Sequence, residues 1–131
     1  MENQIRRAPV SINASKIEES LNEMGAKGYS LIDIQPFNRM RNAGTYRAEI
    51  DPDQVFLSFR RCKNRYHYLA YSCRVSEAGE EEMNATINRM AEQGYDLFKM
   101  LLLQTIAVRS DPGIIRSRFR CFIMILYKEV F

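Results

Sequence analysis

Residues 21–31 read LNEMGAKGYSL, and residues 87–97 read INRMAEQGYDL. The two stretches align without a gap at a separation of 66 residues, about half of the 131-residue chain. The alignment extends backwards, because Ile17 falls on Met83. Self-similarity at a fixed spacing is the signature of a repeated structural unit. The sequence therefore predicts a single domain, 1–131, made of two repeats at about residues 1–63 and 64–131.

Each copy has the pattern of a helix that leads directly into a strand. Asn13 or Ser15 is expected to cap the first helix, and Ser76 the second. Gly28 and Gly94 stand where a helix ends in a left-handed residue. Each helix carries one apolar stripe with i, i+4, i+7 spacing, which predicts a face that packs on a sheet. The stripes are Ile17, Leu21 and Met24 in the first copy and Met83, Ile87 and Met90 in the second.

Strand patterns flank both helices. Val55, Leu57 and Phe59 alternate with less apolar neighbours, as in a half-buried strand. The predicted order is βαβββαββ, an α+β fold of duplicated βαββ units. We expect an antiparallel sheet with both helices packed on one face and an approximate two-fold axis between the units. The predicted strands begin near residues 5, 29, 55, 66, 95 and 122.

The repeated stretch also resembles a known family. Each half reads like the domain-of-unknown-function family 4177, whose members carry a helix of the approximate pattern L-N-E-L-G-A-E-G-W-E-L-V, then a strand ending in an aromatic residue and a base. Tyr29 and Tyr95 replace the usual tryptophan. The resemblance implies the small βαββ fold, and it implies no activity. The matching residues are 21–32 followed by Phe59-Arg60, and 87–98 followed by Tyr127-Lys128.

Composition excludes several classes of protein. The chain is 46% hydrophobic and 27% charged, which argues against disorder. No apolar run approaches the roughly 20 residues that span a bilayer, and residues 1–9 lack the apolar segment of a secretory signal. We therefore expect a cytoplasmic protein without membrane contact. The three cysteines are unevenly spaced, so we expect reduced thiols and neither disulfides nor metal; they are Cys62, Cys73 and Cys121.

Catalytic motifs are absent from the sequence. The one histidine, His67, lies in an alternating strand pattern typical of a sheet surface. The run Glu80-Glu81-Glu82 suits the solvated first turn of a helix, because successive helical residues point in different directions. No phosphate-binding loop or dinucleotide-binding glycine motif occurs. The sequence predicts neither an enzyme nor a cofactor.

Arginine dominates the positive charge, with 14 arginines against 5 lysines at a net charge of only +3. Its planar guanidinium suits phosphate and carboxylate. Arginines recur in two segments expected to be long loops, 38–54 and 107–120, where they could clamp an anion from both sides. The alternative is that these arginines form solvated strand faces or oligomer salt bridges. The predicted ligand-binding residues are Arg39, Arg41, Arg47, Arg109, Arg116 and Arg118.

These patterns leave three functions open. The first is a homo-oligomeric module that binds or sequesters a nucleotide-like anion. By size and charge alone it is similar to small phage proteins that act as counter-defence sponges for nucleotide signals. The second is a protein–protein assembly module, because apolar residues such as Leu101 to Leu103 exceed what a thin layer buries. The third is nucleic-acid binding, which the 16 dispersed carboxylates disfavour.

Overall fold

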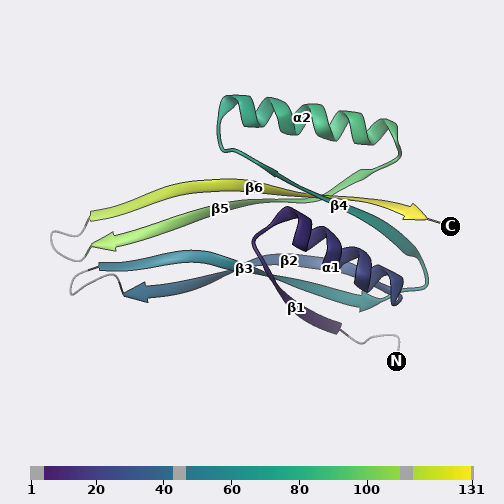
Figure 1. Ribbon diagram of the computed structural model, residues 1–131, viewed down its shortest axis with the longest axis horizontal. Helices are drawn as coiled ribbons and strands as arrows, with labels where there is room; N and C mark the ends of the chain where they lie inside the picture. Colours follow the sequence, from purple (N-terminus) through teal and green to yellow (C-terminus); the bar gives the residue numbers. More distant parts are fainter. Residues whose placement is uncertain (1–4, 43–46, 110–113, 131) are drawn as a thin grey trace.

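The computed structural model describes residues 5–42, 47–109 and 114–130 (Figure 1), and within these ranges it leaves out the side chains of residues 5, 7, 8, 38–42, 47–53, 104–109 and 114–120. The fold is α+β, with two helices and antiparallel strands in the order βαβββαββ. The elements are β1 (Ile5–Ser11), α1 (Ala14–Ala26), β2 (Tyr29–Asn42), β3 (Arg47–Arg61), β4 (Arg65–Cys73), α2 (Glu77–Glu92), β5 (Asp96–Arg109) and β6 (Ile114–Val130).

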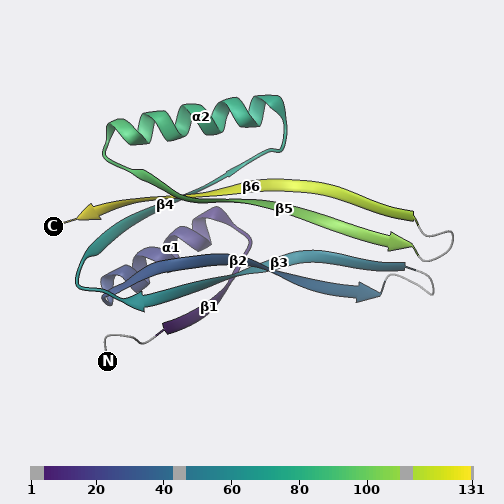
Figure 2. The same ribbon diagram turned by 180° about the vertical axis from the view of Figure 1, so that it is seen from behind.

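The strands form two antiparallel groups of three. In the first, β3 lies between β1 and β2, and in the second, β6 lies between β4 and β5. A short antiparallel pairing of β3 with β5 joins the groups into one six-stranded sheet. It runs from Arg47, opposite Arg109, to Ile50, opposite Ile106. The β2–β3 and β5–β6 hairpins therefore lie side by side, with the C-terminal ends of β2 and β5 at the same end of the molecule (Figures 1 and 2).

The helix ends follow the sequence closely. Asn13 caps α1 by accepting a hydrogen bond from the Lys16 amide, and Ser76 caps α2 by accepting one from the Gly79 amide. Of the two predicted capping residues for α1, Asn13 and Ser15, the structure uses Asn13. Gly28 and Gly94 have φ angles of 90° and 92°, a region that glycine enters without strain. The predicted left-handed helix ends are confirmed.

The two helices pack on different clusters of the core. Ile17 and Leu21 of α1 are fully buried in the larger cluster, which also contains Ile123 and Ile125 of β6. Met83 of α2 instead packs with Met124 of β6 and with Cys73. Because successive strand residues point to opposite faces, the clusters lie on opposite faces of β6. The prediction that both helices cover one face of the sheet is therefore wrong at β6. Because of the way β4 is placed, α1 and α2 lie on different sides of the sheet there.

The segments predicted as long loops are mostly strand. Residues 38–42 and 47–54 extend the β2–β3 hairpin, and residues 107–109 and 114–120 extend the β5–β6 hairpin. The loop prediction is wrong because charged and polar residues were interpreted as connections, whereas they alternate along strands. In the described ranges, neither helix is long and apolar enough to cross a membrane.

Candidate functional site

The backbone register brings the six predicted arginines to one end of the sheet. Across the joined hairpins, Arg41 pairs with Glu49, Glu49 with Ala107, and Ala107 with Arg116. These four residues form one row across β2, β3, β5 and β6. Residues directly opposite one another in an antiparallel pair share a face of the sheet. Arg41 and Arg116 therefore occupy positions on the same face, at its two outer strands.

The remaining arginines belong to neighbouring rows of the same parity. Arg47 pairs with Arg109, two residues from the row just described on each strand. Arg39 pairs with Asp51, and Arg118 pairs with Thr105, again two residues away. Strand residues two apart share a face. We call this set of register positions the arginine face; their side chains lie outside the described residues. It comprises Arg39, Arg41, Arg47, Arg109, Arg116 and Arg118.

An aromatic pair borders the arginine face on β2 and β3. Phe37 lies two residues before Arg39 on β2, and its side chain is 40% exposed. Its ring meets that of Phe56 edge to face, with 5.2 Å between the centroids. An exposed ring two residues from an arginine on the same strand can stack on a flat ligand such as a nucleobase.

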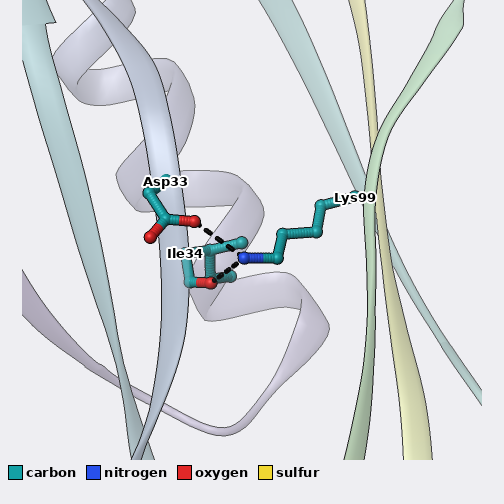
Figure 3. A network of polar contacts seen from close by, with 3 residues as sticks. All are labelled: Asp33, Ile34 and Lys99. Atoms are coloured by element: carbon teal, nitrogen blue, oxygen red, sulfur yellow. Dashed lines mark hydrogen bonds and ion pairs between the residues drawn. The ribbon is translucent and has the colours of Figure 1, made fainter.

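An ion pair ties the two hairpins together at their bases. The Lys99 ammonium lies 2.7 Å from a carboxylate oxygen of Asp33 and donates a 3.0 Å hydrogen bond to the Ile34 carbonyl (Figure 3). The hydrogen bond from Lys99, which outweighs desolvation, lowers the pKa of Asp33 below its usual value. Both side chains are more than one third exposed, so solvent screens the pair. Its main effect is to fix the spacing of β2 and β5.

A buried tyrosine forms a second link between the halves. The Tyr68 ring on β4 is 2% exposed, and its hydroxyl accepts a 2.9 Å hydrogen bond from the Leu31 amide of β2. Burial raises the pKa of Tyr68 above its usual value. This contact holds the second group of strands against the first, close to the Lys99 ion pair. Together the two links position the hairpins that carry the arginine face.

The chain also carries one histidine and three cysteines, all within the described ranges. His67 is exposed, as predicted, and its Nδ1 lies 2.9 Å from the Tyr95 hydroxyl, beside the Lys128 ammonium. In the described ranges no group of three histidine, cysteine or acidic residues could hold a metal ion. Burial raises the pKa of the Cys73 thiol, which keeps it protonated. The cysteines are free, with Cys73 buried and Cys62 and Cys121 half-buried.

Sequence reasoning missed the Asp33–Lys99 link, although a signal for it existed. The two residues lie 66 positions apart, and each comes two residues after the end of one of the two similar stretches. Comparison with protein-family models, curated proteins and solved structures finds no match to this chain.

Proposed function

We propose that this protein is a non-enzymatic binding module that holds an anionic, nucleotide-like small molecule on the arginine face. The observation that carries the proposal is the shared register parity of six arginines across four adjacent strands. Guanidinium groups bind phosphate through paired, charge-assisted hydrogen bonds, so several on one face favour a multiply charged ligand. The exposed Phe37 ring beside Arg39 favours a ligand that also carries a flat base.

We further infer that the two halves arose by duplication and are related by an approximate two-fold axis, as in family 4177-like βαββ units. Support comes from the β-bulges, which occur at equivalent positions of the two hairpins, at Ile32 and at Phe98. The pairing of the equivalent residues Asp33 and Lys99 is what a local two-fold axis between the hairpins would produce. On this view each hairpin contributes half of the ligand site.

A thermal-shift screen tests the binding proposal. Purified protein is melted with nucleotides, cyclic nucleotides, sugar phosphates and short oligonucleotides. A ligand at 100 times its Kd adds about 2.7 kcal/mol of stability, which is readily resolved. The shift should vanish in Arg47→Ala and Arg109→Ala variants and persist in Arg74→Ala, an exposed arginine after β4. A flat screen, or equal loss in all three variants, would refute the arginine face as the site.

A second candidate function is homo-oligomeric or heteromeric assembly without a small ligand. It is favoured by large apolar side chains that one chain leaves exposed, including Leu97 at 42% and Leu102 at 43%. Exposed apolar surface of this kind commonly marks protein interfaces. Self-association without any thermal response to anions would favour this function over ligand binding. A response only to oligonucleotides, with a steep dependence on salt, would instead indicate nucleic-acid binding.

A further inference from the structure

Helix α1 uses a second stripe of side chains to cover the outer edge of strand β4. Asn22 donates a 2.9 Å hydrogen bond to the Tyr68 carbonyl and accepts one of the same length from the Tyr68 amide. Glu18 accepts a hydrogen bond from the Ala70 amide. Gly25 completes the stripe, and a Cβ there would approach the β4 backbone at 3.3 Å. The helix thus takes the place of a neighbouring strand along the edge of β4 that faces away from β6.

The equivalent stripe on α2 covers nothing within the described chain. Residues 66 positions later are Asn84, Asn88 and Ala91, and all three are exposed. In the described part of the structure neither asparagine side chain makes a hydrogen bond. The buried face of α2 is centred on other residues, among them Met83 and Met90. The stripe on α2 therefore carries an amide, a second polar side chain and a small residue at the positions that bind a strand edge in α1.

Strand β1 offers the matching edge. Aligning the two hairpins at their β-bulges puts Arg60 on Tyr127, and the partners of these residues are Ile5 on β1 and Tyr68 on β4. Ile5 is therefore the counterpart of the residue that Asn22 binds. On its other side, β1 pairs with β3 over its whole length.

Pro9 fixes which backbone groups of β1 point outward. Proline has no N–H to donate, so within a sheet it is accommodated where its nitrogen faces away from the neighbouring strand. Backbone groups alternate along a strand, so Ile5, Arg7 and Pro9 present theirs to the same outer edge. Among the described residues this edge has no neighbouring strand, and it presents the N–H and C=O of Ile5 and the N–H of Arg7, which match the groups bound on β4.

The two surfaces cannot meet within one chain, because α2 and β1 lie on opposite sides of the molecule in both views (Figures 1 and 2). We propose that the α2 stripe docks on the outer edge of β1 from a second copy of this chain. Asn88 then bonds the amide and carbonyl of Ile5, and Asn84 accepts from the Arg7 amide, as Asn22 and Glu18 do for β4. The inference is independent of the ligand, since neither surface includes the arginine face.

Two complementary variants test the contact by light scattering after size exclusion. Asn88→Arg blocks the stripe, and Arg7→Pro removes an outward amide while leaving the pairing with β3 intact. Each variant alone should run as a monomer, whereas Gln93→Arg, which adds the same charge at the exposed C-cap residue of α2, should keep the mass of the wild type. Circular dichroism should report the same fold for all three.

Mixing the two blocked variants provides the decisive measurement. The Arg7→Pro chain retains an intact α2 stripe, and the Asn88→Arg chain retains an intact β1 edge. An equimolar mixture should therefore recover a species of two chains held by one α2–β1 contact, with a Kd weaker than that of the wild type. A monomeric wild type, an unchanged mass in either variant, or a mixture that remains monomeric would overturn the proposal. None of these results depends on binding of an anion.

Discussion

The hydroxyl of Tyr68 allows a sharp test of how the two halves are held together. In a Tyr68→Phe variant the ring still fills the same buried space, but the Leu31 amide loses its acceptor. A buried backbone donor left without a partner costs about 1–3 kcal/mol, whereas the extra desolvation of the hydroxyl itself is relieved. For a chain of this size, 1 kcal/mol corresponds to roughly 3–5 °C in Tm. We therefore expect a loss of about 3–15 °C at neutral pH.

The same substitution changes the response to alkaline pH. Because burial raises the pKa of Tyr68 in the folded state, folding favours the protonated phenol. The stabilising contribution is complete below the unfolded pKa of about 10 and is lost as the pH rises through the folded value. The wild type should therefore lose stability above about pH 10 in a way that the variant, which has no phenol at this position, does not. The difference in unfolding free energy should shrink accordingly.

Urea unfolding at neutral pH and at stepwise alkaline pH measures both effects. Tyr71→Phe is the matched control, because Tyr71 is half-buried and its hydroxyl makes only a 3.6 Å contact with the sulfur of Met90. The Tyr71→Phe variant should lose less than about 0.5 kcal/mol of unfolding free energy, the usual range for sites without a strong contact. Equal losses at the two tyrosines, or a constant difference between wild type and Tyr68→Phe up to high pH, would refute the reasoning.

Lys99, Gly79 and Cys73 each allow a test of one local feature of the structure. Lys99→Met should lower the free energy of unfolding in urea by about 0.2–1 kcal/mol at neutral pH. Because the pKa of Asp33 is lowered in the folded state, this loss should be present above about pH 4 and fade as the pH falls through the folded-state pKa. Gly79→Ala should lower the unfolding free energy measured by calorimetry by about 1–3 kcal/mol or more, because the new Cβ would lie 1.9 Å from the Arg74 carbonyl oxygen. An unchanged Tm would contradict this close packing at the start of α2. Cys73 should react with a maleimide far more slowly in the folded protein than in urea, and fast labelling without denaturant would contradict its burial.

The features of the fold that could be predicted from the sequence are those that depend on local chemistry. The caps at Asn13 and Ser76 and the left-handed glycines depend only on residues within one helical turn, so the pattern predicted them. The order of strands and helices was equally accessible from periodicity. The side on which each helix packs was not, because it depends on how β4 inserts between α1 and β6. That placement is set by hydrogen bonds such as those of Asn22, which link residues far apart in the chain.

The arginine face illustrates the same limit in the candidate site. Alternation within one strand was visible in Arg39 and Arg41, and a strand interpretation of that alternation would have avoided the loop error. Whether Arg47 shares a face with Arg109 depends on the register between β3 and β5, which no local pattern encodes. A slip of one residue in that short pairing would bring the positions of the two hairpins to opposite faces of the sheet. Anything that fixes the spacing of the hairpins, including the Asp33–Lys99 pair, therefore also fixes whether their charges can act on one ligand.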